Sequence, residues 1–416
     1  MFVGSLQITD ALPKSTSQGT KDLDSLPCRP LTPEMEAKLI ARGRLYTALS
    51  GIHYRSYHNE RIMVDGINIG LANFPRPPGH YDHIMIDEIG PIRPPAHEGA
   101  DLPEEHLWLL PGFVYGFNLS RKMWSTFYVT EIEPVSFDHG AWDHFVLDPA
   151  TKVLVKSLVQ VTRNSNSFAS KTISDVITGK GGGLFCVLHG PPGTGKTLTA
   201  EAVAEHLERP LYVVGTSELS TVPSELEGKL KSILDLATAW DAVLLIDEAD
   251  VLLEQRSLHE IERNSLVSVV LRILEYHRGV LFLTTNRVKV FDAAFLSRFS
   301  IAIKYPEHDL HSRRVIWRKF FELAGVKTRD ADGSGRSTPT DMVLLEDPTK
   351  VATMSEAELD ELAQKPFNGR TIKNLVRTAQ ALALASDEPM SKAHVDIVVR
   401  SQEKFLREFA NVSSAE

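Results

Sequence analysis

The segment that most constrains this chain is a glycine-rich loop that ends in lysine and threonine. It reads Gly190-Pro191-Pro192-Gly193-Thr194-Gly195-Lys196-Thr197 and fits the pattern G-x-x-x-x-G-K-[ST], in which backbone N–H groups surround the phosphates of a nucleotide. The apolar run at 184–188 predicts a buried strand that enters the loop. The run at 197–207 predicts a helix whose N-terminal dipole faces the phosphates. We expect these eight residues, together with Leu198, to line a phosphate site.

Composition and charge limit the classes of protein to consider. The chain has 416 residues, of which 43% are hydrophobic and 24% charged, as in ordinary soluble proteins. Its net charge of −9 gives no global basic field to draw nucleic acid or an anionic membrane. No apolar run approaches the ~18–20 residues needed to span a bilayer. The N-terminus lacks a secretory pattern, and Cys28 and Cys186 form neither a disulfide framework nor a metal pattern. We expect an intracellular protein of the cytoplasm or nucleus.

The first part of the chain predicts a tail and a β-rich domain. Residues 1–30 are rich in Ser, Thr, Pro and Gly, which predicts a flexible tail. Residues 31–163 are expected to form an N-terminal α+β domain in which short β-leaning runs dominate. Within it, residues 61–69 predict a hairpin with Asp65-Gly66 at the turn. Further expected elements are strands at 84–86, 113–115 and 126–129, a loop at 91–105 and a helix at 152–161. A polar linker follows at 163–167.

After the linker the pattern changes to alternating strands and helices. Apolar runs predict strands at 184–188, 211–214, 242–246, 280–284 and 301–305. Helical periods at 226–237 and 266–274 lie between them. The fold expected for 168–308 is therefore an α/β domain with a five-stranded parallel sheet, whose ligands bind at the carboxyl ends of the strands. Residues 309–410 predict a helical lid, with helices at 313–324, 372–383 and 395–409, a capping box at Ser355 and Glu358, and a disordered insertion at 330–340.

Two acids follow the third of these strands. Asp247 and Glu248 come directly after four apolar residues, where ionised carboxylates are costly unless they meet a cation. We expect Asp247 and Thr197 to hold Mg²⁺ and Glu248 to orient the attacking water. Asn286 ends the fourth strand, where its amide would bond the water or the γ-phosphate. By itself, an asparagine at a strand end is more often a turn former.

Four motifs together are similar to the AAA ATPases, the ATPases associated with diverse cellular activities. They are the loop 190–197, Asp247-Glu248-Ala249-Asp250, Thr285-Asn286-Arg287 and Phe295-Leu296-Ser297-Arg298-Phe299, in the order and spacing of that family. The resemblance covers about 168–409. More narrowly, the sequence LEYHRGVLFLTTNRVKVFDAAFLSRF and the preceding domain resemble a group of largely uncharacterised fungal AAA ATPases, whose N-terminal domain has no assigned activity.

The resemblance implies roles at matching positions. It implies a P-loop nucleoside triphosphatase fold with ATP and Mg²⁺ as ligands, assembled as a homo-oligomeric ring, typically a hexamer. Arg298 would be the arginine finger that reaches the γ-phosphate of a neighbouring subunit's ATP. Ile177 lies where the family's adenine-flanking segment lies and would pack on the base. Arg370 matches the second sensor region, where two readings stay open: contact with phosphate, or a place on a helix surface.

One departure from the family bears on the use of the energy. Members that thread proteins carry an aromatic residue in a pore loop after the second strand, whereas residues 217–224 here have no aromatic and a proline. The leading hypothesis is an oligomeric ATPase that remodels a protein client chosen by residues 31–163. A nucleotide-gated scaffold with slow hydrolysis is the alternative. A nucleic-acid motor is disfavoured by the net charge of −9.

Overall fold

The computed structural model describes residues 31–69, 103–140, 142, 148–163, 183–250, 261–275, 277, 279–287, 292–329 and 353–413. The expected tail, the strand at 84–86, the insertion at 330–340 and Ile177 lie outside these residues, as do most of the loop at 91–105 and most of the linker at 163–167. The chain forms two compact units, which divide between Pro134 and Val135.

The first unit is an antiparallel sheet with one long helix. Helix α2 (Pro33–Ala48) precedes β1 (Ile52–Tyr57), β2 (Glu60–Asp65), β3 (Phe113–Asn118), β4 (Met123–Tyr128) and the short β5 (Ile132–Glu133). Two short 3₁₀ helices are η2 (Glu104–Leu109) and η3 (Val129–Glu131). The strands lie in the order β4-β3-β2-β1-β5, and Ile62, Val64, Val114 and Phe127 form their buried core. The predicted strands at 113–115 and 126–129 fall in β3 and at β4, and the β-rich character of this unit is confirmed.

The hairpin predicted at 61–69 is wrong. Residues 61–65 lie in one strand, β2, which pairs with β1 before it. The turn is made by His58 and Asn59, with φ of 48° and 63°, the left-handed pair that joins two strands of natural twist. Asp65 instead accepts hydrogen bonds from the backbone N–H groups of Ile67 and Asn68. The Asp-Gly pair therefore ends a strand with a side-chain turn rather than reversing the chain.

The helix predicted at 152–161 is present as α3 (Pro149–Arg163). We expected it to close the first domain, but it lies in the second unit. Val155 of α3 is 1% exposed and joins the core cluster of the parallel sheet. Since this apolar side chain is buried against the sheet, α3 is part of the unit that follows it.

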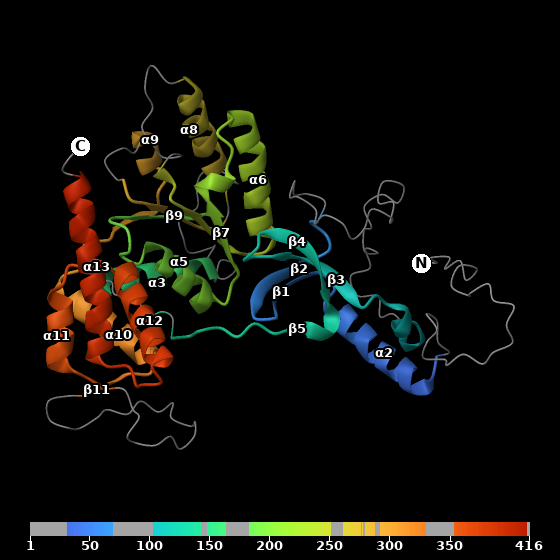
Figure 1. Cartoon of the computed structure of the whole chain (residues 1–416). Coiled ribbons are helices and arrows are strands. Elements are labelled where there is room, and N and C mark those ends of the chain that lie inside the picture. The colour runs from blue at the N-terminus through green and yellow to red at the C-terminus, as the bar shows by residue number, and fades with distance from the viewer. Residues whose placement is uncertain are drawn as a thin grey trace, which may run out of the picture. The chain divides into compact units, whose positions relative to one another are not determined.

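The second unit is built on a parallel sheet. Its strands are β6 (Leu184–His189), β7 (Leu211–Gly215), β8 (Val243–Asp247), β9 (Val280–Thr285) and β10 (Ile301–Lys304), in the order β10-β6-β9-β8-β7. The helices that follow are α5 (Lys196–Leu207), α6 (Pro223–Ala239), α8 (Ile261–Leu274) and the short α9 (Ala293–Leu296). Helices α6 and α8 lie on one side of the sheet, and α3 and α5 on the other (Figure 1). The expected α/β fold with five parallel strands is confirmed.

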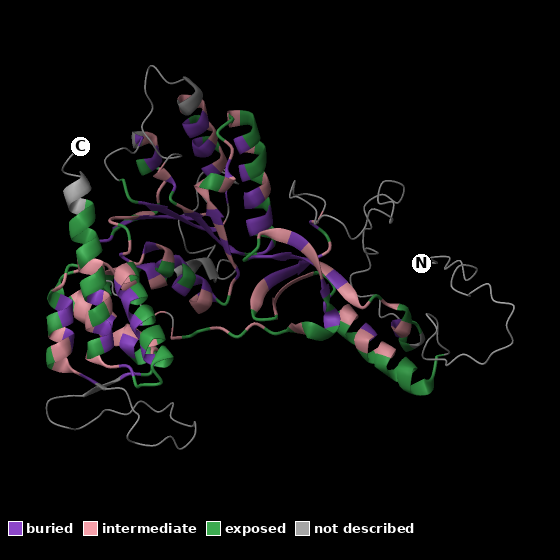
Figure 2. Cartoon of the chain, viewed as in Figure 1, coloured by how far each residue is buried: buried purple, intermediate pink, exposed green. Residues whose placement is uncertain are grey.

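The central strands are buried on both faces, which explains their continuous apolar sequences. Val187, Leu244 and Phe282 have no exposed surface, and the strands are purple along their length in Figure 2. Helix α5 packs on them through small residues, including Ala200 and Ala204, which let its backbone lie close to the sheet. This packing fixes the start of α5 at the carboxyl end of β6.

The last part of the second unit is helical. It contains α10 (Leu310–Leu323), α11 (Glu356–Gln364), α12 (Gly369–Ala385) and α13 (Lys392–Ser413), with a small parallel pair of β11 (Lys327–Arg329) and β12 (Thr353–Ser355). Trp317 and Phe321 stack at the centre of its core, with ring centroids 5.5 Å apart. Ser355 and Glu358 form the predicted capping box. Among the described helices, none is both long and apolar enough to cross a membrane.

Candidate functional site

The glycine-rich loop turns tightly between β6 and α5. Gly190 has a φ of 148°, and a Cβ at this position would lie 2.2 Å from the carbonyl oxygen of Tyr305. Only glycine therefore fits between the loop and β10. The hydroxyl of Thr194 donates to the carbonyl oxygen of Pro191 at 2.8 Å and closes the loop on itself. Contacts within the protein thus hold the loop in its turn.

Lys196 is folded over this loop. Its side chain is buried, and Nζ donates to the carbonyl oxygens of Gly190 and Pro191 at 2.8 and 2.7 Å. Burial lowers the pKa of Lys196, while the charges of Asp247 and Asp250 act in the opposite direction. A desolvated ammonium whose partners are neutral carbonyls is a ready binding group for phosphate oxygens.

Thr197 and Asp247 meet at the carboxyl end of β8. The Thr197 hydroxyl lies 3.3 and 3.4 Å from the two carboxylate oxygens of Asp247. A hydroxyl and a carboxylate are oxygen donors of the type that Mg²⁺ takes beside substrate phosphates. Within the described residues no cluster of three or more His, Cys, Asp or Glu could hold a metal by itself. Thr197 and Asp247 therefore fit a cation whose remaining ligands come from the phosphates of a nucleotide.

Glu248 follows with an unusual backbone. Its φ is +55°, in the left-handed region that costs a non-glycine residue roughly 1 kcal/mol. The Glu248 N–H donates to the Thr284 hydroxyl at 3.0 Å. The side chain is exposed, so its carboxylate reaches solvent at the edge where Thr197 and Asp247 lie.

Asn286 lies just beyond β9 at the same edge. Its backbone N–H donates to Asp250 Oδ1 at 3.2 Å, and the Thr285 hydroxyl also bonds Asp250. The Gly190 N–H donates to the carbonyl oxygen of Thr285 at 3.2 Å, which ties the start of the loop to this strand. The structure therefore brings Asn286 next to the loop, with its side chain exposed.

Arg298 is held within its own chain. It follows α9, and its guanidinium donates to the carbonyl oxygen of Ala294 at 2.9 Å and lies 3.7 Å from a carboxylate oxygen of Glu275. The side chain keeps 31% of its surface exposed. These contacts join it to α9 and to the end of α8, on elements apart from the glycine-rich loop.

The lid contacts the loop through Gly369, which with Arg370 forms the expected second sensor region, and through His308 and Asn368, which the sequence analysis missed. The Gly369 N–H donates to the carbonyl oxygen of Gly193 at 3.0 Å, and His308 Nε2 lies 3.3 Å from the same oxygen. Asn368 caps α12 by accepting from the Thr371 N–H. Asn-Gly before a helical period could have indicated this cap, whereas no pattern marks His308. Arg370 is exposed, and its charge contributes to lowering the pKa of Lys196, which places it within electrostatic range of the loop.

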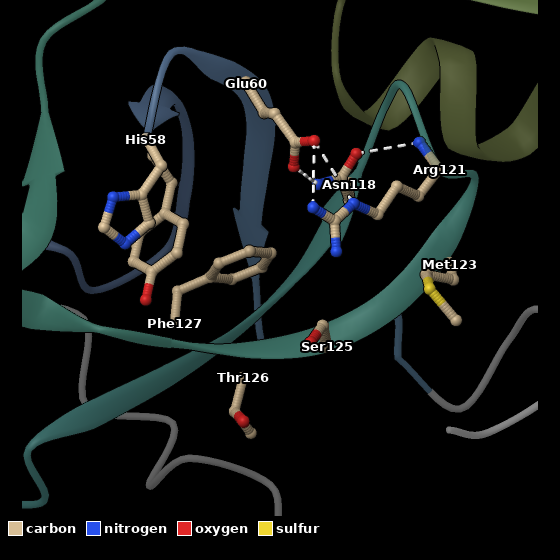
Figure 3. A pocket seen from close by; sticks show the side chains of 9 residues that line it. His58, Glu60, Asn118, Arg121, Met123, Ser125, Thr126 and Phe127 are labelled. Carbon is tan, nitrogen blue, oxygen red and sulfur yellow. Dashed lines mark hydrogen bonds and ion pairs between the residues drawn. The ribbon is translucent and has the colours of Figure 1, made fainter. Parts of the chain in front are cut away.

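The first unit carries a hollow of its own (Figure 3). It has a volume of about 190 Å³ and is lined by polar and aromatic side chains of β1–β4 and their turns. Glu60 accepts from Asn118 at 2.7 Å and from Arg121 at 3.1 and 3.2 Å. The hydrogen bond from Asn118 holds the pKa of Glu60 below its usual value, and the bond and charge of Arg121 act in the same direction. Because this carboxylate and guanidinium engage each other, we assign no chemistry to the hollow.

The sheet, loop and acids define the class of protein. Residues 186–307 match the family model described as ATPase family associated with various cellular activities (AAA). The parallel-sheet domain of the second unit is therefore an AAA domain, the domain of AAA-type ATPases.

The chain is similar to curated relatives over part of their lengths. ATPase family AAA domain-containing protein 3B of Homo sapiens is 27% identical over 266 residues, which cover 61% of this chain and 37% of the relative. Spastin of Anopheles gambiae is 26% identical over 242 residues, 55% of this chain and 29% of the relative. A putative 26S proteasome regulatory subunit homolog of Methanothermobacter thermautotrophicus is 26% identical over 229 residues, 52% of this chain and 54% of the relative. The chain thus spans about a third to a half of their lengths.

Proposed function

We propose that this protein binds ATP with Mg²⁺ on the loop 190–197 and hydrolyses its γ-phosphate. The observation that carries the proposal is the meeting of Thr197 and Asp247 at 3.3 Å, beside a buried Lys196 and the exposed Glu248. These groups arrive from α5 and β8, and a strand end without a ligand needs no such convergence of charge. The geometry of the loop and of both acids supports the proposal.

Each side chain then has one task. Lys196 exchanges its carbonyl partners for phosphate oxygens, and loop N–H groups bind the remaining phosphate charge. When bound to Thr197 and Asp247, Mg²⁺ neutralises charge on the phosphate oxygens. Glu248 orients and polarises the attacking water, and Asn286 bonds the water or the γ-phosphate. The charge of Arg370 contributes to lowering the pKa of Lys196, and this supports the phosphate-contact reading over the helix-surface reading. We keep Ile177 as the proposed adenine contact.

Hydrolysis on this proposal requires a neighbouring subunit. Arg298 sits on elements apart from the loop and is engaged by Ala294 and Glu275 of its own chain. In a homo-oligomeric ring, as AAA proteins commonly form, it would stabilise transition-state charge in the next subunit's site. Turnover would then depend on assembly.

A remodelling machine is the role that we propose for the assembled protein, with the first unit choosing a protein client. One observation favours the scaffold alternative. Residues 216–218 form a 3₁₀ turn, Ser220 bonds Glu225, and Pro223 begins α6. Residues 217–224 contain no aromatic, and Val222 among them is half exposed. This segment offers little to grip an extended polypeptide.

Mixed subunits test the hydrolysis proposal. Glu248→Gln and Arg298→Ala should each abolish turnover by itself while retaining ATP binding, and Lys196→Ala should lose binding. A mixture of the Glu248→Gln and Arg298→Ala proteins should regain turnover, because intact sites of one then meet intact fingers of the other. Arg272→Ala, at an exposed arginine of α8 paired with Glu227, is the matched control and should behave as wild type.

Two results would overturn this scheme. Turnover per subunit that is equal in all variants and independent of protein concentration excludes catalysis between subunits. A mixture that stays inactive means that Arg298 acts on the ATP site of its own subunit.

The scaffold alternative has its own test. If it holds, assembly should follow ATP binding while turnover stays below roughly one per minute, against about 10 per second for ordinary enzymes. Strong stimulation of turnover by a client contradicts it.

A further inference from the structure

Thr284 contacts three successive residues of the acidic segment. Its hydroxyl donates to Asp247 Oδ1 and accepts from the Glu248 N–H at 3.0 Å. Its backbone carbonyl accepts from the Ala249 N–H at 2.9 Å. The side chain is 2% exposed, so these bonds form away from competing water and count for more than surface bonds.

The position of Thr284 explains why it can do this. It lies in β9, next to β8, where Ile246 pairs with Leu283. Asp247 and Thr284 are the residues that follow this pair on the two strands. Most side chains of β9 are apolar and pack into the core, and Thr284 places a hydroxyl where the core ends and the site begins. A valine of the same shape would fill the space and leave both the carboxylate and the N–H without this partner.

We infer that Thr284 is a positioning residue that sets the orientation of the Asp247 carboxylate and holds Glu248 in its left-handed backbone conformation. This inference rests on the proposed function, in which Asp247 binds the cation and Glu248 orients water. The Thr284 hydroxyl donates to Asp247 Oδ1, and the Thr197 hydroxyl lies 3.3 and 3.4 Å from the two oxygens of the same carboxylate, so both hydroxyls restrain its rotation. The bond to the Glu248 N–H offsets the strain of its φ of +55°. One hydroxyl therefore couples metal binding at Asp247 to the orientation of Glu248.

The test compares Thr284→Val, which removes the hydroxyl, with Thr284→Ser, which retains it. Binding of a fluorescent ADP is measured in EDTA and then titrated with Mg²⁺. In EDTA, Thr284→Val should bind within about twofold of wild type, because the loop is unchanged. The Mg²⁺ concentration that gives half of the change in ADP binding should rise about tenfold, which is the effect expected when a hydrogen-bond partner of a metal ligand is removed. Thr284→Ser should restore the wild-type value.

A second readout needs no nucleotide. Hydrogen exchange at the Glu248 N–H should become at least about tenfold faster in Thr284→Val, since its acceptor is gone. Exchange at the Ala249 N–H should stay as in wild type, because its acceptor is the backbone carbonyl of residue 284. Ala249 thus shows within the same molecule that the strands remain folded.

Distinct outcomes separate the inference from the proposed function. Thr284→Val values within twofold of wild type in both the Mg²⁺ titration and the Glu248 exchange overturn the inference. So does a Thr284→Ser protein that behaves like Thr284→Val, because the hydroxyl is then not the cause. A wild-type protein without Mg²⁺-dependent turnover defeats the proposed hydrolysis, while the exchange comparison still decides the role of Thr284.

Discussion

Among the described residues, several buried polar side chains lie near the candidate site. Thr284 and Thr285 use their hydroxyls on Asp247 and Asp250. His277 is different: it is 5% exposed, and its ring is tilted by 42° against that of Phe185, with ring centroids 6.0 Å apart. Among the described residues, neither of its ring nitrogens has a hydrogen-bond partner. Burial lowers the pKa of His277 to about 4.

The acid stability of the protein should depend on His277. Its folded pKa of about 4 lies below the ordinary value of 6.5, so the unfolded chain binds the proton more readily between these values. The free energy of unfolding should therefore fall as the pH drops from about 6.5 to 4, by about 3 kcal/mol for this residue. His277→Leu should lose this part of the pH dependence, as measured by urea unfolding at pH 7 and pH 5. An unchanged difference between the two pH values contradicts the prediction.

At the level of elements, the sequence predicts best where one interaction dominates. The predicted ranges of the five parallel strands agree with the structure to within one residue. The central strands β6, β8 and β9 are buried and carry apolar side chains along most of their length, which makes them easy to recognise. The lid helices and the Ser355 capping box were predictable for similar local reasons. The hairpin prediction at Asp65-Gly66 was wrong because residues typical of turns also end strands. Only the pairing of β2 with β1 shows that Asp65-Gly66 ends a strand. Thr284 and His308 act across distant segments, which local patterns cannot show.

The hairpin turn gives a direct test of the corrected register. Asn59 has a φ of 63°, so Asn59→Ala should lower the free energy of unfolding by about 1 kcal/mol. Gly66 has no positive φ, and a Cβ there meets nothing within 4 Å. Gly66→Ala should therefore change stability by less than about 0.5 kcal/mol. Urea unfolding of both variants is the measurement, and the reverse order would restore the turn to Asp65-Gly66.

The capping box of α11 should carry measurable lid stability. Ser355 accepts from the Glu358 N–H at 3.3 Å, and the Ser355 N–H donates to Glu358 at 2.8 Å. Ser355→Ala should cost about 1 kcal/mol in the free energy of unfolding. Ser401→Ala, at an exposed position within α13, is the control and should be neutral or slightly stabilising. Equal changes in the free energy of unfolding for Ser355→Ala and Ser401→Ala would contradict a stabilising role of the cap.

Across the second unit, the lid and the phosphate loop are joined at Gly193. Its carbonyl oxygen is bound by Gly369 and faced by His308. A Cβ on Gly193 would lie 2.7 Å from the Asn368 side chain, and one on Gly369 would lie 2.9 Å from the Gly193 oxygen. We therefore expect a change in loop shape on nucleotide binding to displace the first residues of α12.

Gly369→Ala tests this connection. Alanine is a better helix former than glycine, so the substitution should help α12 and harm only the contact with the loop. We expect nucleotide affinity to fall about tenfold, close to 1.4 kcal/mol, with a smaller rise of Tm on adding ADP. Gly228→Ala in α6, where a Cβ meets nothing within 4 Å, is the matched control and should raise Tm without changing affinity. Wild-type affinity in Gly369→Ala would show that the lid and the loop are independent.

The left-handed backbone at Glu248 has a consequence for engineering. Glycine or asparagine would relax this position, so a search that selects only for thermal tolerance should favour replacing the acid. Such variants would melt later and yet lose the carboxylate that we assign to the attacking water. Robustness and turnover are thus set against each other at a single residue, and a screen for hardier forms of this protein must include hydrolysis as a selection.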